Sequence, residues 1–223
     1  MSPGKRGSGI TFESQCPTNV LPANWQQAIK NELVSLNLPG VLIGAPITGI
    51  HCVLVGSIAN LAHSGSEDFR KSTRRALRQG LMTLKEKGGC QILEPLDNFK
   101  LTIPQENLGQ AIGDLQRMNG EVKSTINING MLLLTGVVPT NKFQNYSKQL
   151  RAYTHSQGYL ECQTIGYQPS HQQTALIADT DYDATADQDY PINSLFCINK
   201  VNTEINWKDV PNYSYYPAGK LAQ

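Results

Sequence analysis

The dipeptide Asn129-Gly130 constrains this sequence more than any other feature, because it separates two stretches that have the character of adjacent strands. Asn-Gly between such stretches is typical of a two-residue β-hairpin turn, in which both central residues need positive φ. Before it, Val122 to Ile128 alternates apolar and polar side chains, as a half-buried strand does. After it, Met131 to Val138 is almost entirely apolar. We therefore expect two antiparallel neighbouring strands here.

A strand and a helix are expected on each side of this hairpin. On the N-terminal side, a strand from Leu96 to Ile103 precedes a helix that Pro104 opens and Gly120 closes. On the C-terminal side, Pro139-Thr140 opens a helix, and a strand from Tyr159 to Tyr167 follows it. The apolar positions of these helices are Leu108, Ala111, Ile112, Leu115, Phe143, Tyr146 and Leu150. The order βαββαβ predicts a ferredoxin-like domain over 90–168, a fold that hosts many functions and identifies none.

The residues before Gly88 predict another small α+β domain over 1–89. A helix follows Pro22, a strand spans Ile47 to Val55, and a helix runs from Phe69 to Lys87 after a polar segment. Ser64 with Glu67, or Ser66, is the expected cap of that last helix. Its apolar stripe is Phe69, Ala76, Leu77, Leu81 and Leu84, and its remaining positions carry seven basic residues: Arg70, Lys71, Arg74, Arg75, Arg78, Lys85 and Lys87.

Two interpretations of this basic helix remain open from composition alone. The cations form a solvated face that keeps the protein soluble, or they contact the phosphates of a nucleic acid. The net charge of the chain is only +1, so any basic surface must be local. The preceding loop holds Asn60, His63 and Ser64, whose side chains can reach bases or sugars in structured RNA.

The segment from 169 to 223 differs in composition and is expected to be an acidic, solvated linker followed by a short C-terminal element. Its carboxylates repel one another and few apolar residues compensate. They are Asp179, Asp181, Asp183, Asp187 and Asp189. Four of them match the spacing of a calcium-binding EF-hand loop, but Ala184 and Tyr190 occupy the positions of its glycine and its bidentate glutamate. No metal site is therefore expected.

The sequence offers no catalytic motif. GKRGSG near the start lacks the spacing of a phosphate-binding loop, so GTP binding by the usual motif is not expected. The four histidines are scattered, and the five cysteines form no CxxC pair, which favours free, buried thiols in a reducing cytosol. No stretch reaches the roughly 18 apolar residues of a membrane span, and the N-terminal residues are not expected to form a signal peptide, because no apolar run follows their basic residues. We expect a soluble, cytoplasmic protein that is not an enzyme.

Several ordered segments resemble one family. GSGITFES near the start, GSIANLAHSGSEDFRK from Gly56 to Lys71, and ILEPLDNFKLTIPQENLGQAIGDLQRMNG from Ile92 to Gly120 resemble the fourth and fifth domains of elongation factor G. VPTNKFQNYSKQLRAYTHSQGYLECQTIGYQP resembles the second half of the fifth domain, and its closing Gly166-Tyr167 is more similar to the tetracycline-resistance ribosomal protection proteins. The first domain would then have the βα fold of ribosomal protein S5.

The resemblance implies a ribosome-binding role. The loop at the tip of the fourth domain would reach the 16S rRNA decoding centre and help displace tetracycline. Its residues are Ile58, Ala59, Asn60, Leu61, Ala62, His63 and Ser64. Phosphate contacts are expected from Arg70, Lys71, Arg74, Arg75 and Arg78, and contacts to the GTPase-associated region of 23S rRNA from Arg117 and Asn119. The protein would act as a monomer, and GTP with Mg²⁺ would bind only in the parent GTPase.

Three departures from the family keep alternatives open. Ala62 stands where a protection protein is expected to have proline, and GDLQRMNG is closer to elongation factor G. The first strand of the fourth domain is also expected to be missing, leaving an unpaired edge at Thr11 to Ser14. One alternative is therefore a fragment of an elongation factor G paralogue that acts in translocation. Another is a stand-alone interaction module without ribosome activity.

Overall fold

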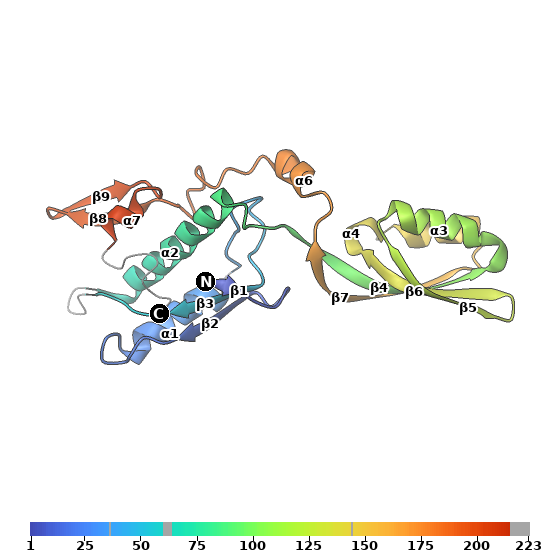
Figure 1. The fold of residues 1–223 in the computed structure, drawn as a ribbon, viewed down its shortest axis with the longest axis horizontal. Coiled ribbons are helices and arrows are strands. Elements are labelled where there is room, and N and C mark those ends of the chain that lie inside the picture. Colours follow the sequence, from blue (N-terminus) through green and yellow to red (C-terminus); the bar gives the residue numbers. More distant parts are fainter. Residues whose placement is uncertain (36, 60–63, 144, 215–223) are drawn as a thin grey trace. The chain divides into compact units, whose positions relative to one another are not determined.

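The computed structural model describes residues 1–35, 37–59, 64–143 and 145–214, and it divides into two compact units (Figure 1). Unit 1 consists of residues 1–91 together with the segment from Gln172 onward, and unit 2 consists of residues 92–171. The chain therefore leaves unit 1 once and returns to it. This arrangement confirms an α+β protein of two domains, with the second beginning two residues later than expected.

Unit 1 contains a three-stranded sheet in the order β1-β3-β2. These strands are β1 (Ser2–Pro3), β2 (Ile10–Ser14) and β3 (Ile50–Leu54). β2 runs parallel to β3 and β1 runs antiparallel to it. Among the described strands β2 pairs only with β3, so it is an edge strand, in agreement with the expected exposed edge at Thr11 to Ser14.

Helices α1 (Ala23–Ser35) and α2 (Ser66–Glu86) pack against each other in unit 1. The rings of Trp25 on α1 and Phe69 on α2 stack at 4.8 Å between centroids. The expected stripe of α2 is buried at Phe69, Leu77 and Leu81, whereas Leu84 is exposed and Met82 takes a buried place instead. α2 begins three residues earlier than expected, because the backbone N–H of Gly65 donates to the Asp68 carboxylate at 2.9 Å. The cap is thus Gly65, a glycine with no side chain to contribute, and not Ser64 or Ser66.

The segment after unit 2 is not a solvated linker, and that expectation is wrong. It forms α6 (Gln173–Thr180), the hairpin β8 (Ser194–Ile198) with β9 (Val201–Ile205), and α7 (Val210–Tyr213). Ala184, Ile192 and Trp207 are buried in the core of unit 1. These apolar residues are few, but each buries almost its whole side chain in the core of unit 1. This burial of apolar surface stabilises the folded segment and offsets the repulsion among the neighbouring carboxylates.

Unit 2 is the expected ferredoxin-like domain, with sheet order β5-β6-β4-β7. Its strands are β4 (Leu93–Pro104), β5 (Glu121–Ile128), β6 (Met131–Pro139) and β7 (Tyr159–Pro169). A short 3₁₀ turn η1 (Gln105–Asn107) leads into α3 (Leu108–Arg117), and the second crossover is α4 (Thr140–Phe143) followed by α5 (Tyr146–Tyr153). The helices cover one face of the sheet (Figure 1).

The hairpin at the centre of unit 2 has the predicted geometry. Ile128 pairs with Met131, and Asn129 and Gly130 both have positive φ, at 51° and 84°. Behind it, alternate residues of β4 (Phe99, Leu101 and Ile103) are buried under α3 and α5. The strong local signals and the apolar alternation thus agree on one register.

The cysteines only partly match the expectation of buried thiols. All five are free, and Cys16 and Cys52 are buried, but Cys162 and Cys197 are exposed. Burial raises the pKa of the Cys52 thiol. In the described part of the chain, no helix has the length and apolar character needed to cross a membrane.

Candidate functional site

Helix α2 presents its basic residues in two different ways. Arg70 and Lys71 are exposed and Arg75 is half-buried, and for Lys71 and Arg75 no ion pair is found among the described residues. Arg70 lies 3.9 Å from Glu67 one turn earlier, a surface pair that leaves its charge available. These three side chains form the outward basic row of α2, and they are free to contact a phosphate.

Arg74 and Arg78 both form ion pairs within unit 1, and the burial of Arg78 contradicts part of the expected phosphate-contacting set. Arg74 forms an ion pair with Glu32 of α1, whose side chain is only 5% exposed. The hydrogen bond that Arg74 donates to the Glu32 carboxylate raises the pKa of the Arg74 guanidinium. Arg78 is 2% exposed, so its charge cannot reach RNA without unfolding of the site. We therefore remove Arg78 from the candidate contacts, while Arg74 remains partly accessible.

Arg78 instead connects α2 to the segment from Gln172 onward, which returns to unit 1 and is called the returning segment below. Its guanidinium donates to the carbonyl oxygens of Pro39 at 3.0 Å and Ala184 at 3.3 Å, and it lies 3.5 Å from the Asp187 carboxylate. It also donates to the Tyr182 hydroxyl at 3.3 Å. We call Arg78, Tyr182 and Asp187 the clasp.

Asp187 is the acceptor at the centre of the clasp. The Tyr182 hydroxyl donates to it at 2.5 Å and the Tyr190 N–H at 2.9 Å. Burial opposes the charged form of Asp187, but these hydrogen bonds and the Arg78 charge together lower its pKa. Sequence reasoning missed this role, although two signals pointed to it: Arg78 is three residues before the apolar Leu81, and an acidic run follows later in the chain.

The expected tip loop lies only partly within the described residues. Ile58 is 70% exposed and Ala59 is also exposed, while Ser64 is half-buried just before α2. Asn60, Leu61, Ala62 and His63 lie outside the described residues. Within the described residues, the expected loop therefore begins with an apolar, exposed Ile58, and the outward basic row of α2 follows the loop.

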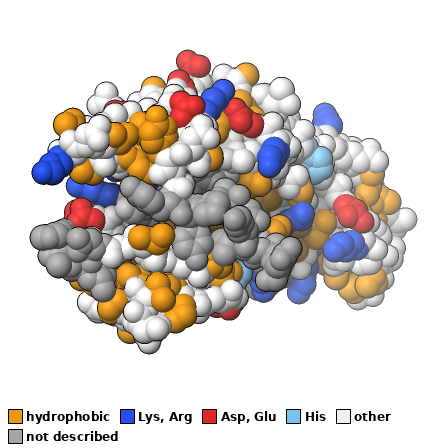
Figure 2. All heavy atoms as spheres, turned by 60° about the vertical axis from the view of Figure 1, so that its left-hand side comes forward, with side chains coloured by type: hydrophobic (Ala, Val, Ile, Leu, Met, Phe, Trp, Pro, Cys, Tyr) orange, Lys and Arg blue, Asp and Glu red, His pale blue; other side chains and the backbone are white. Residues whose placement is uncertain are grey.

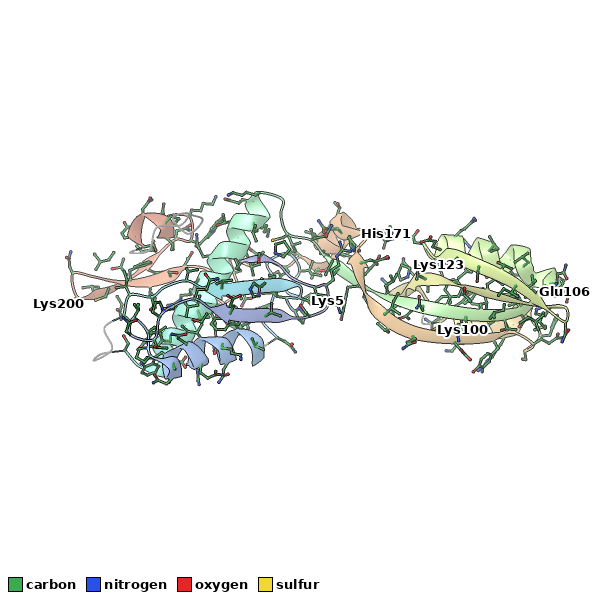
Figure 3. The ribbon with its side chains drawn as sticks, turned by 60° about the horizontal axis from the view of Figure 1, so that its bottom comes forward. Lys5, Lys100, Glu106, Lys123, His171 and Lys200 are labelled. Carbon is green, nitrogen blue, oxygen red and sulfur yellow. The ribbon has the colours of Figure 1, made fainter. Side chains whose placement is uncertain are left out.

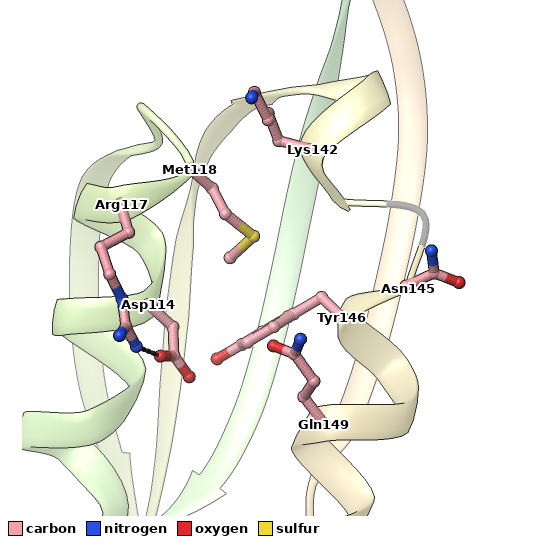
Figure 4. A pocket seen from close by; sticks show the side chains of 7 residues that line it. All are labelled: Asp114, Arg117, Met118, Lys142, Asn145, Tyr146 and Gln149. Carbon is pink, nitrogen blue, oxygen red and sulfur yellow. Dashed lines mark hydrogen bonds and ion pairs between the residues drawn. The ribbon is translucent and has the colours of Figure 1, made fainter.

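Unit 2 has a cavity of about 300 Å³ beside Arg117 (Figure 4). It is lined by Asp114, Arg117, Met118, Lys142, Asn145, Tyr146 and Gln149. Arg117 forms an ion pair with the buried Asp114 but keeps 77% of its side chain exposed. Asn119 lies just after α3 with φ 59°, a left-handed conformation that asparagine tolerates.

The floor of this cavity is a buried phenol. The hydroxyl groups of Tyr146 and Tyr153 lie 2.8 Å apart. Burial raises the pKa of Tyr146, and the Tyr153 hydroxyl and Asp114 carboxylate add to this effect, so Tyr146 stays neutral near pH 7. Arg117 and Lys142 can bind a polar group at the rim of the cavity. The neutral Tyr146 hydroxyl is no candidate nucleophile.

Charged groups are otherwise dispersed. On the face seen in Figure 2, Lys and Arg side chains lie singly or in small groups among acidic and hydrophobic ones, not as one continuous basic surface. This distribution agrees with the net charge of +1. A nucleic-acid contact on this face would therefore involve separate elements and not one broad basic surface.

The two units correspond to two family models. Residues 1–85 match elongation factor G domain IV, and residues 91–177 match the elongation factor G C-terminus. The chain belongs to the elongation factor G family. The second matched range begins one residue before unit 2 and extends six residues beyond its end at His171. The residues after 177, which include the clasp residues Tyr182 and Asp187, lie outside both ranges.

Curated relatives of the family come from both functional branches that the sequence suggested. The chain is 27% identical to Elongation factor G 2 of Shewanella frigidimarina over 168 residues, covering 75% of this chain and 23% of that protein. It is also 27% identical to the tetracycline resistance protein TetP of Clostridium perfringens over 199 residues, covering 89% of this chain and 30% of TetP. The chain thus spans less than a third of the length of these relatives.

A solved structure supports the fold. A crystal structure of a protein from Thermus thermophilus superposes with a TM-score of 0.69 at 21% identity, covering 81% of this chain and 26% of that one. The parts of elongation factor G that the chain matches are domain IV and the C-terminus, which are non-catalytic parts of a translational GTPase.

Proposed function

We propose that this chain is the ribosome-binding C-terminal part of a translational GTPase of the tetracycline-resistance ribosomal protection type. In this proposal unit 1 contacts 16S rRNA at the decoding centre and unit 2 contacts the GTPase-associated region of 23S rRNA. The chain has no catalytic activity of its own, and GTP with Mg²⁺ binds in other domains. It acts as a monomer in the cytoplasm, where ribosomes are.

One observation carries the ribosome contact. Arg70, Lys71 and Arg75 lie on the outer side of α2, which follows the expected tip loop Ile58 to Ser64. Arg70 pairs with the exposed Glu67, and Lys71 and Arg75 have no ion pair among the described residues. Cations of this kind fix a protein on nucleic acid by neutralising phosphates, while a projecting loop reaches bases or sugars. Arg117 and Asn119 are the corresponding candidates in unit 2.

The test is co-sedimentation with bacterial 70S ribosomes across a salt series. Each phosphate contact contributes roughly 0.7–0.9 to the slope of log affinity against log salt concentration. We expect Lys71→Gln with Arg75→Gln to weaken binding and to reduce that slope by about 1.5. Lys30→Gln is the matched control, because Lys30 is exposed on α1 of the same unit. Binding that does not vary with salt, or an unchanged slope in the double variant, would refute the phosphate contacts.

The choice between protection and translocation has its own support and its own test. The alignment with TetP covers more of this chain than the alignment with Elongation factor G 2, which favours protection. In the test, this chain replaces the aligned region of TetP, and the growth of a tetracycline-sensitive strain that expresses the chimera is measured on tetracycline. We expect the chimera to raise tolerance above that of a TetP lacking the region. If it does not, while an equivalent chimera of Elongation factor G 2 sustains translocation, the paralogue alternative is correct.

A further inference from the structure

A second cavity in unit 2 has no role in the contacts proposed above. It measures about 290 Å³ and is lined by Asp97, Thr140, Phe143, Ser147, Leu160 and Cys162. These residues come from β4, α4, α5 and β7, so the cavity lies on the helix-covered side of the sheet. A volume near 300 Å³ is at the small end of the range for ligand pockets.

Asp97 places a carboxylate in this cavity with little compensation. The residue is 6% exposed, and it follows the same alternation as the buried Phe99 and Leu101. The Thr164 hydroxyl donates to its Oδ1 at 2.7 Å. No Lys, Arg or His within the described ranges forms an ion pair with it, although a carboxylate can accept about four hydrogen bonds. A buried carboxylate with one donor and no counter-charge is costly to the folded state.

A second polar group in the same cavity lacks a partner. The Thr140 Oγ1 is buried and makes no hydrogen bond in the structure. Buried polar atoms in native proteins almost always have a partner, so an orphaned hydroxyl beside an uncompensated carboxylate calls for an explanation. Both groups lie against the same empty volume, which indicates that their partner occupies it.

The lining determines the chemistry of that partner. Asp97 supplies negative charge, the hydroxyl groups of Thr140 and Ser147 can accept hydrogen bonds, and Phe143 and Leu160 supply apolar walls. Divalent metals need several charged or oxygen ligands, and the described residues contain no group of three His, Cys, Asp or Glu that could hold one. A planar or tetrahedral nitrogen cation on a short carbon stem satisfies all of these groups at once.

We propose that this cavity binds a small organic cation with N–H donors, either a guanidinium or an alkylammonium group. Its nitrogen donates to the free lone pairs of Asp97 and to Thr140 Oγ1, and its carbon stem lies against Phe143 and Leu160. The source is the side chain of a partner protein or a free amine metabolite, which share this chemistry. The inference does not depend on ribosome binding, since it uses none of the residues assigned to RNA.

The first experiment measures binding with a matched pair of probes. Ethylguanidinium carries the required charge, whereas ethylurea has nearly the same shape and is neutral. In a nitrogen–proton NMR titration of the full chain, we expect saturable shifts at Asp97, Thr140 and Cys162 with ethylguanidinium. Ethylurea should bind at least about tenfold more weakly, because hydrogen bonds to charged groups are the stronger ones. Equal binding of the two probes, or shifts spread evenly over the chain, would overturn the proposal and leave a cavity that holds water only.

The second experiment separates a binding role from a structural one. Asp97→Asn keeps the shape and the acceptor for Thr164 but removes the charge. We expect this variant to be at least as heat-stable as the wild type without probe, because a buried, uncompensated charge is gone. It should also lose the stabilisation that ethylguanidinium gives the wild type. Glu106→Gln is the control, because Glu106 is an exposed carboxylate of the same unit (Figure 3). A variant that is destabilised yet still stabilised by the probe would show that Asp97 is merely structural.

The two sources of the cation can be told apart once the probe binds. Agmatine and putrescine test free amines, and a short peptide with a terminal arginine amide tests a protein side chain. A peptide that binds at least tenfold more tightly than agmatine would indicate a partner protein, and the reverse order would indicate a metabolite. Failure of all three compounds to bind a protein that binds ethylguanidinium would refute both of these sources.

Discussion

The clasp between α2 and the returning segment gives the sharpest test of the fold. Asp187→Asn removes the negative charge that faces the buried Arg78, while the amide oxygen can still accept from Tyr190. Breaking a buried ion pair by removing one partner typically costs about 3–5 kcal/mol, because the other charge stays buried and uncompensated. Here Arg78 keeps two carbonyl acceptors, at Pro39 and Ala184, and Asp187 is 13% exposed. We therefore expect the lower part of that range, about 3 kcal/mol of unfolding free energy.

Urea unfolding followed by tryptophan fluorescence measures this loss. The chain has two tryptophans, and both Trp25 and Trp207 lie in the core region of unit 1, so the signal reports that unit. The control is Asp179→Asn in the same acidic run, which removes an exposed carboxylate and should change stability by less than about 0.5 kcal/mol. Equal unfolding midpoints for the two variants would refute the clasp.

The same pair makes unit 1 sensitive to acid. The pKa of Asp187 is lowered in the folded state, so the unfolded state binds its proton more readily. Its contribution is thus fully present above the unfolded pKa of about 4 and is lost as the pH falls through the lower folded value. Wild-type unit 1 should lose stability over that range, and Asp187→Asn should lose less of it. Parallel pH profiles would contradict the assigned charge state.

Three further predictions concern the edge strand β2, a close approach in β6 and helix α3. Amide hydrogen exchange should be faster at Thr11 to Ser14 in the edge strand β2 than at Leu133 in β6, which is paired on both sides. Equal protection of β2 and β6 would contradict the pairing. Gly136→Ala should destabilise unit 2 by about 2 kcal/mol or more, since its Cβ would lie 2.0 Å from the Glu121 carbonyl oxygen. Gly113→Ala, which meets nothing within 4 Å in α3, should instead stabilise it by about 0.5–1 kcal/mol, and circular dichroism of thermal unfolding would detect the opposite signs or their absence.

Unit 2 could be predicted from the sequence because its signals are local. A turn dipeptide, two strands of clear alternation and two proline-initiated helices specify the order of elements and the register of the hairpin. The returning segment could not be predicted in this way. Its buried residues Ala184, Ile192 and Trp207 have no helical or strand periodicity. Arg78, which donates to the Ala184 carbonyl oxygen and lies beside Asp187, is more than a hundred positions earlier in the chain. The composition of this acidic segment indicates only that it is well solvated. It does not reveal the contacts with Arg78 that the segment makes in the folded protein.

The basic helix shows why a list of cations overestimates a nucleic-acid surface. Arg74 and Arg78 are four residues apart and lie three or four residues from Leu77, Leu81 and Met82, so helical geometry puts them on the buried side of α2. Glu32 and Asp187 then neutralise them within unit 1. Arg70, Lys71 and Arg75 have no such buried acidic partner. Loss of an inward cation should therefore lower the unfolding free energy, whereas loss of an outward one should lower the salt slope of ribosome binding, and the two measurements together separate the roles on a single helix.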